Sequence, residues 1–167
     1  FMLLGGDPAT NDIMDGIDVT WARFPNGGAE IGQATEKVIA AFDPGDPAAS
    51  VPALLAIRTK LAALASNPVV DDKRRQLDRI IRTCLGLTVE SIATADEVVP
   101  GETLTVRSRA VADSRVPIRW DAVRVSGLVD REQSADLKPG QPVTREFSFV
   151  VPKSTPLTQP YWLRAEP

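Results

Sequence analysis

The chain has 167 residues, 43% of them hydrophobic, which is enough for one domain or two small ones with a buried core. Its 19 basic and 22 acidic residues give a net charge of −3 without a basic stripe, which argues against nucleic acid and anionic membranes as partners. No window approaches the roughly 18 apolar residues of a membrane span. With no histidine and one cysteine, the chain cannot form an intrachain disulfide.

The N-terminal part is rich in turn-forming residues and then changes to helical periodicity. Residues 1–28 contain several clusters of Gly, Pro, Asn and Asp, which predict an irregular, extended segment. From residue 29 to residue 42 apolar side chains recur at helical spacing, and the Pro- and Gly-rich stretch 43–47 stops the pattern. We therefore predict one amphipathic helix over 29–42.

A second helix is predicted to begin at Ser50. The Ser50 hydroxyl is placed to cap it, and Pro52 is tolerated in the first turn, where its missing N–H would be unpaired anyway. Asn67 and Pro68 end the helix. Its predicted apolar face consists of Leu54, Ile57, Leu61 and Leu64.

A third helix is predicted from Asn67 and Pro68 onward. Gly86 is placed to be its C′ residue, because a left-handed conformation ends many helices. The basic run 73–75 is interpreted as the solvated face of this helix. The predicted apolar stripe consists of Val70, Leu77, Ile80, Ile81, Cys84 and Leu85.

After Gly86 the hydrophobic period shortens to two, which is typical of strands with one buried face. Pro-Gly pairs at 100–101 and 139–140 precede strands and match a type II turn, in which Pro sets φ and Gly accepts a positive φ. The pattern predicts an antiparallel sandwich. Strands are predicted at 87–92, 103–111, 116–125 and 143–151, with a fifth at 161–163.

No group of residues in the sequence is typical of a catalytic site. Cys84 has no histidine to activate it and falls on an apolar helix face, which favours a core thiol. The acidic residues between 7 and 18 lack the spacing of a calcium-binding loop, so turn and cap roles are favoured. A carboxylate pair for glycoside hydrolysis stays open, since nothing singles out one pair.

Four aromatic residues are the candidate glycan or interface contacts. Flat rings stack on sugars when exposed and supply apolar area when buried. Burial is favoured for Trp120, which follows Ile118 in a strand pattern. The four candidates are Trp21, Trp120, Tyr161 and Trp162.

Five short motifs run in order along nearly the whole chain: DGIDVTWAR at 15–23, AFDP at 41–44, LDR at 77–79, VVPGETLTV at 98–106 and PYWLR at 160–164. In this order they resemble the region that follows the catalytic domain in large bacterial PIG-L (LmbE-like) N-acetylglucosaminyl deacetylases. The β part also resembles immunoglobulin-like modules of secreted bacterial carbohydrate-active enzymes, a likeness of fold that leaves function open.

The resemblance implies a parent enzyme that binds zinc through a His-Pro-Asp-Asp-Glu type motif and a later histidine, and that activates water against an acetamide. This chain has neither the motif nor any histidine, and zinc prefers nitrogen and sulfur ligands. We therefore expect no catalytic residue, metal ligand or cofactor in this chain, with zinc held by a catalytic domain that precedes Phe1. The resemblance also implies a bacterial protein and leaves its export undecided.

The sequence thus predicts an α+β chain: an extended segment and about three helices in 1–86, then an antiparallel immunoglobulin-like sandwich in 87–167. The sandwich could be incomplete, because five strands are fewer than the usual seven or so. The expected function is non-catalytic, packing on or positioning the catalytic domain of a PIG-L-like deacetylase. The alternatives are a carbohydrate-binding module with exposed aromatic residues on one sandwich face, and a protein-interaction spacer with a continuous apolar patch. The expected partners are the parent's own catalytic domain and a glycan.

Overall fold

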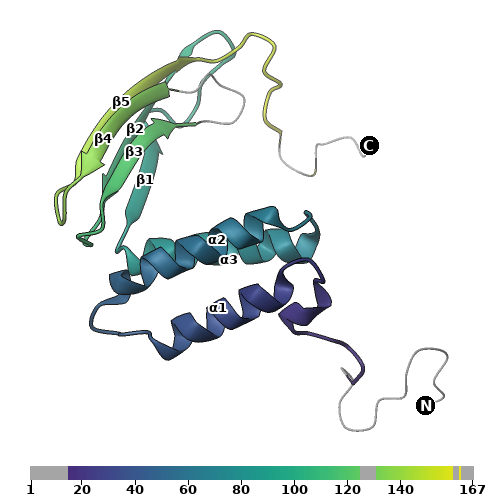
Figure 1. Ribbon diagram of the computed structural model, residues 1–167. Coiled ribbons are helices and arrows are strands. Elements are labelled where there is room, and N and C mark those ends of the chain that lie inside the picture. The colour runs from purple at the N-terminus through teal and green to yellow at the C-terminus, as the bar shows by residue number, and fades with distance from the viewer. Residues whose placement is uncertain (1–14, 125–130, 160–161, 163–167) are drawn as a thin grey trace. The chain divides into compact units, whose positions relative to one another are not determined.

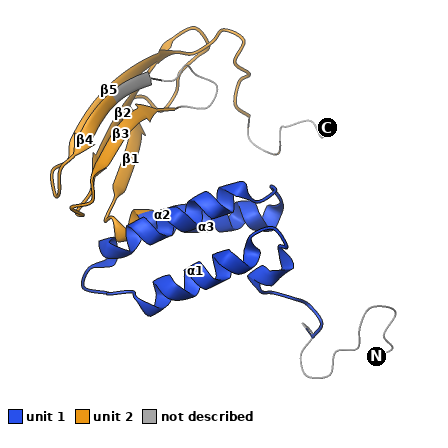
Figure 2. Cartoon of the chain, in the orientation of Figure 1, with its two compact units in different colours: residues 1–81 blue, residues 82–167 orange. Residues whose placement is uncertain are grey.

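The computed structural model describes residues 15–124, 131–159 and 162, and within these ranges the side chains of 131–133 are not described. The chain divides into two compact units, residues 1–81 and 82–167 (Figure 2). The described part of unit 1 is helical, whereas unit 2 consists mainly of antiparallel strands (Figure 1). The α+β class predicted from the two periodicities is confirmed.

Three α-helices form the described part of unit 1, close to the predicted positions. Two short 3-10 helices, η1 (Trp21–Arg23) and η2 (Pro47–Ser50), precede α1 and α2. The α-helices are α1 (Gly28–Ala40), α2 (Val51–Ala63) and α3 (Pro68–Cys84), and the division between the units falls near the C-terminal end of α3.

The predicted cap of α2 is wrong. Ser50 has helical backbone angles and makes no side-chain cap hydrogen bond, because η2 runs directly into α2 and leaves no extended residue at the junction. Pro52 does occupy the first turn of α2, as predicted.

Both predicted ends of α3 are confirmed. The side-chain Oδ1 of Asn67 accepts hydrogen bonds from the amides of Val69 and Val70, each at 3.0 Å. At the other end Gly86 has a φ of +57°. Its amide donates to the Thr83 carbonyl at 3.0 Å, and the Leu87 amide donates to the Arg82 carbonyl at 2.9 Å, which is a Schellman motif.

The basic run 73–75 is not a uniform solvated face, which corrects the prediction. Arg74 folds back onto the C-terminal end of α2, where its Nη2 donates to the carbonyls of Leu61 at 2.9 Å and Leu64 at 2.8 Å. These carbonyls belong to the C-terminal end of α2, where the Leu61 carbonyl also accepts from the Leu64 amide at 3.3 Å. Lys73 lies on the inner side of α3, so only Arg75 is exposed.

The core of unit 1 is formed by one face of each helix. The face predicted for α2 is buried. In α3, however, Ile80 is half exposed and Cys84 is half-buried, so the predicted stripe is only partly covered. The buried apolar residues are Ile31, Val51, Leu54, Ile57, Leu61, Leu64, Val70, Leu77 and Ile81.

Unit 2 contains two antiparallel sheets. The first has the strand order β1-β2-β5, and the second pairs β3 with β4. The strands are β1 (Thr88–Ala93), β2 (Thr103–Val111), β3 (Ile118–Val123), β4 (Arg131–Leu137) and β5 (Val143–Val150).

The sequence-based prediction missed β4 and named a strand at 161–163 instead. In the sequence REQSADL the one large apolar residue is Leu137, so the period-two signal is too weak to recognise without the pairing partner. The proposed strand at 161–163 falls largely outside the described residues.

The two sheets pack through two apolar clusters. One joins Phe147 and Phe149 with Val106 and the ring of Trp120, and the other is built around Ala110, Ala112 and Leu137. Between them the register aligns a polar row across the first sheet, with Ser91 opposite Ser108 and Ser108 opposite Arg145. The hydroxyls of Ser91 and Ser108 lie 2.8 Å apart. Ser108 is fully buried, and this pairing satisfies its polar group.

Candidate functional site

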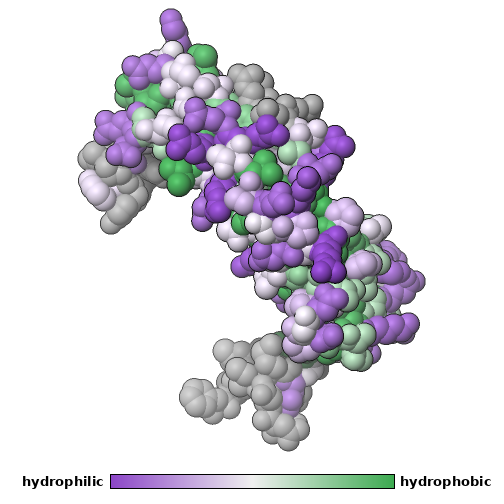
Figure 3. All heavy atoms as spheres, turned by 90° about the vertical axis from the view of Figure 1, so that its left-hand side faces the viewer, coloured by the Kyte–Doolittle hydropathy of each residue, from purple (hydrophilic) through white to green (hydrophobic). Residues whose placement is uncertain are grey.

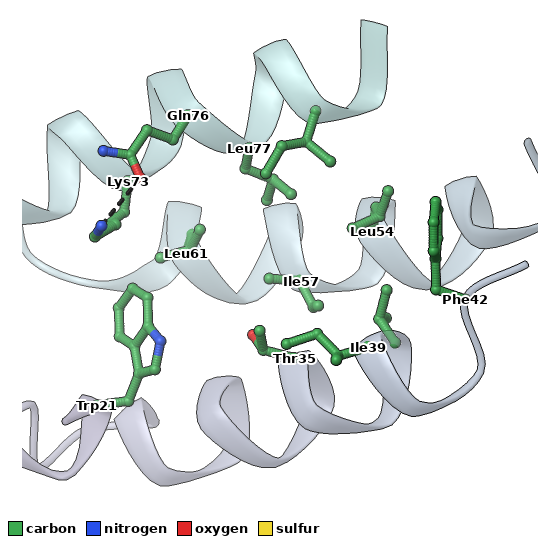
Figure 4. A pocket seen from close by; sticks show the side chains of 12 residues that line it. Trp21, Thr35, Ile39, Phe42, Leu54, Ile57, Leu61, Lys73, Gln76 and Leu77 are labelled. Atoms are coloured by element: carbon green, nitrogen blue, oxygen red, sulfur yellow. Dashed lines mark hydrogen bonds between the residues drawn. The ribbon is translucent and has the colours of Figure 1, made fainter. Parts of the chain in front are cut away.

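An apolar groove runs between the three helices of unit 1. Figure 4 shows α2 between the other two helices, with side chains of α1 and α3 reaching toward it from either side. Trp21 and Lys73 lie at one end, and Phe42 lies at the other. The groove encloses about 500 Å³, within the range of roughly 300–1,000 Å³ typical of ligand sites.

Most of the lining is aliphatic or aromatic, and part of it is accessible to solvent. Ile39 is 70% exposed, Ile80 50% and Phe42 47%, although all three lie beside the buried core. In the space-filling view of Figure 3, apolar residues in green lie at the surface among hydrophilic residues in purple. A groove lined by exposed apolar side chains is a common feature of binding sites. The lining residues are Trp21, Thr35, Val38, Ile39, Phe42, Leu54, Ile57, Leu61, Lys73, Gln76, Leu77 and Ile80.

The lining contains few polar side chains, of which Lys73 lies at the Trp21 end and Thr35 near the middle (Figure 4). The Lys73 ammonium donates to the Gln76 side-chain carbonyl at 3.0 Å, and the Gln76 amide donates in turn to the Asp72 carboxylate. The Thr35 hydroxyl donates to the Ile31 carbonyl at 2.8 Å, within its own helix. Lys73 is therefore the charged group on the lining, and its hydrogen-bond partner there is a neutral amide.

Local sequence chemistry holds Trp21 at its end of the groove. The Thr20 hydroxyl accepts from the Ala22 amide at 3.2 Å and so caps η1. The carboxylate of Asp18 accepts from both the hydroxyl and the amide of Thr20, and these hydrogen bonds lower the pKa of Asp18. The ring of Trp21 stacks at a tilt against that of Phe24, with 5.7 Å between centroids.

Gly28 allows η1 to approach the start of α1. A Cβ at position 28 would lie 2.0 Å from the Trp21 carbonyl oxygen and 2.9 Å from the Cβ of Phe24. A larger residue would push η1, and with it the indole, away from the groove. This requirement is steric, because Gly28 does not have a positive φ.

The structure describes three of the four aromatic candidates. Trp21 belongs to the groove of unit 1, whereas Trp120 lies in unit 2 with its ring packed against Phe147 and its indole N–H donating to the Ala122 carbonyl at 3.0 Å. Trp162 is 70% exposed, and Tyr161 lies outside the described residues.

The groove itself was not predicted from the sequence. Its signal was present in the helix predicted over 29–42, whose apolar face includes Ile39 and Phe42, but periodicity cannot tell a covered face from an uncovered one. Lys73 was missed because a basic run on a helix was read as solvated. The described lining contains no carboxylate, thiol or imidazole, so its chemistry suits binding of an apolar partner.

Comparison with models of known families, with characterised proteins and with solved structures finds no match to this chain. In the part of the chain that the structure describes, no helix combines the length and apolar character needed to cross a membrane. The elements and the division into units define the class of the fold, a two-unit α+β protein. Its distinguishing feature is an apolar groove in the helical unit.

Proposed function

We propose that the chain is a non-catalytic docking region whose helical unit binds an apolar helix of a neighbouring catalytic domain. The observation that carries this proposal is the exposed apolar lining of the groove, above all Ile39, Phe42 and Ile80. Burying such side chains contributes roughly 1.5–3 kcal/mol each when exposure is complete, so a partner that covers them gains free energy. A helix is the expected occupant, because parallel walls of helical side chains are typical of helix-in-groove recognition.

Lys73 predicts where the partner helix carries a charged group. Its ammonium lies at the Trp21 end of an otherwise apolar lining, so an acidic residue at the matching end of the incoming helix would gain a charge-assisted hydrogen bond. The proposed occupant is thus an amphipathic helix with an apolar face and one carboxylate near its end.

The order of the five sequence motifs supports a PIG-L-like deacetylase as the protein to which this helix belongs. In that proposal the zinc and the reacting groups lie in the catalytic domain, and this chain positions that domain. Unit 2 would be an immunoglobulin-like sandwich: β1, β2 and β5 correspond in order to strands A, B and E, and β3 to strand C of that fold.

The test measures binding between this chain and the remaining polypeptide encoded by the same gene, expressed separately, by isothermal titration calorimetry. Ile80→Glu places a charge in the groove and should weaken binding about tenfold or more. Leu55→Glu is the matched control, because Leu55 is similarly exposed, at 46%, on α2 and does not line the groove. Equal binding by both variants would refute the docking proposal.

A deacetylase assay with added zinc addresses the non-catalytic part of the proposal. An N-acetylglucosaminide should be hydrolysed by the longer polypeptide and not by the 167-residue chain. Activity in this chain alone would overturn the proposal.

A further inference from the structure

A second surface that could bind a partner lies in unit 2, at the free edge of strand β1. In the β1-β2-β5 sheet β1 is an edge strand, so about half of its backbone N–H and C=O groups point away from β2. Its six residues pair with β2 in continuous register. They include no proline, lysine or arginine, and the pairing shows no bulge, so Glu90 is the one charged side chain that protects this edge.

The inner face of β1 is also uncovered. Val89 and Ala93 lie opposite Ala110 and Val106 of β2 and therefore point to the same side of the sheet. The two β2 residues are buried, at 2% and 7% exposure, whereas Val89 is 55% exposed. The packing between the sheets thus covers β2 and β5 and leaves the β1 margin open.

We propose that β1 pairs antiparallel with β1 of a second copy of this chain, which would join two β1-β2-β5 sheets into one. Antiparallel pairing of identical strands has a two-fold axis, and directly opposite residues point to the same face. One residue of β1 must therefore face the same residue of the second copy across the axis. The two residues nearest the middle of β1 are Glu90 and Ser91.

Charge decides between these two registers. An axis at Glu90 would place the two Glu90 carboxylates directly opposite each other, which is destabilising. An axis at Ser91 places Glu90 opposite Ile92 of the second copy, and Val89 opposite Ala93. This register pairs residues 89–93 of β1 with the same five residues of the second copy and places Thr88 opposite Thr94, just beyond the strand. It also brings Val89 and Ala93 together on the inner face across the junction.

The partner inferred from this pattern is a second copy, because in the Ser91 register no like charges face each other and the apolar Val89 and Ala93 lie side by side. Ile92 is 67% exposed on the outer face, and in the pair its side chain lies beside the stem of Glu90. Ser91 keeps its hydrogen bond to Ser108, since that bond lies within each copy.

The test is sedimentation equilibrium of the whole chain over a range of concentrations. The chain without substitutions should form a dimer. Ile92→Glu places carboxylates opposite Glu90 at two symmetry-related positions and should raise the dimer dissociation constant about tenfold. Ile92→Lys should leave the constant unchanged or lower it, because the introduced ammonium faces Glu90. The double variant Glu90→Lys/Ile92→Glu should restore dimerisation.

Three results would overturn the proposal: a monomer at every concentration, equal weakening by Ile92→Glu and Ile92→Lys, or failure of the double variant to recover. Far-UV circular dichroism verifies that each variant folds, as expected for an exposed position. Ile80→Glu, in the groove of unit 1, should leave the dimer intact. A dimer sensitive to Ile80→Glu alone would instead assign self-association to the groove, so this inference and the docking proposal fail separately.

Discussion

Replacing Arg74 by methionine removes the connection between α3 and the C-terminal end of α2. The guanidinium donates to the Leu61 carbonyl through Nε at 3.1 Å and Nη2 at 2.9 Å, and to the Leu64 carbonyl at 2.8 Å. Its Nη1 also donates to Asp71 at 2.8 Å. Methionine keeps the apolar stem and removes these donors, although the Leu61 carbonyl still accepts from the Leu64 amide at 3.3 Å.

The expected loss is larger than for a surface ion pair. A hydrogen bond from a charged donor contributes about 1.5–3 kcal/mol, and a cation at a helix C-terminus adds about 0.3–1 kcal/mol. The bonds share one side chain and are not additive, and the Arg74 side chain is 29% exposed, so water replaces part of what is lost. We expect Arg74→Met to lower the free energy of unfolding of unit 1 by about 2–3 kcal/mol, with Arg74→Lys near half of that because lysine reaches fewer carbonyls.

The assay is urea unfolding followed by Trp21 fluorescence in a Trp120→Phe/Trp162→Phe background, so that the signal reports unit 1. The adjacent Arg75→Met is the matched control. Arg75 pairs with Asp72 at 3.4 Å on an exposed surface, and its loss should cost at most about 0.5 kcal/mol. If Arg74→Met and Arg75→Met change the free energy of unfolding equally, the bonds to α2 do not stabilise the unit.

Two further predictions concern α1. Gly28→Ala should destabilise unit 1 by about 1–3 kcal/mol, since its Cβ would overlap the Trp21 carbonyl. Gly32→Ala should stabilise unit 1 by about 0.5–1 kcal/mol, because the nearest atom to that Cβ is 3.6 Å away. Thermal unfolding of both variants measures this difference, and equal shifts would contradict the steric explanation. The hydrogen bond from Lys60 and its charge lower the pKa of Glu30. The pair therefore stabilises the fold fully above the ordinary glutamate pKa, and this stabilisation is lost as the pH falls through the lowered pKa of Glu30 in the folded state. An NMR titration should place the Glu30 midpoint below that of an unstructured glutamate, and Lys60→Met should return it to the ordinary range.

The sequence by itself determined most of the secondary structure of this protein. Strong local signals marked the helices, because Asn67 caps α3 with its own side chain and Gly86 accepts the left-handed conformation of a Schellman motif. The period-two patterns identified four of the strands, and the helix and strand periods together established the α+β class. These features depend on residues near one another in the chain, so they can be recognised without a tertiary partner.

Only the tertiary structure decided which of these faces are covered. The strand β4 is stabilised by pairing with β3, and its sequence alone carries too few apolar residues to reveal it. Arg74 and Lys73 are neighbours in one basic run, yet the first caps α2 and the second lines the groove, because helical rotation points them in different directions. The apolar faces of α1 and α3 are equally visible in the sequence whether or not something covers them. Burial depends on contacts between segments that are far apart in the sequence. The exposure of Ile39 and Ile80 is therefore known only once the packing of all three helices is known.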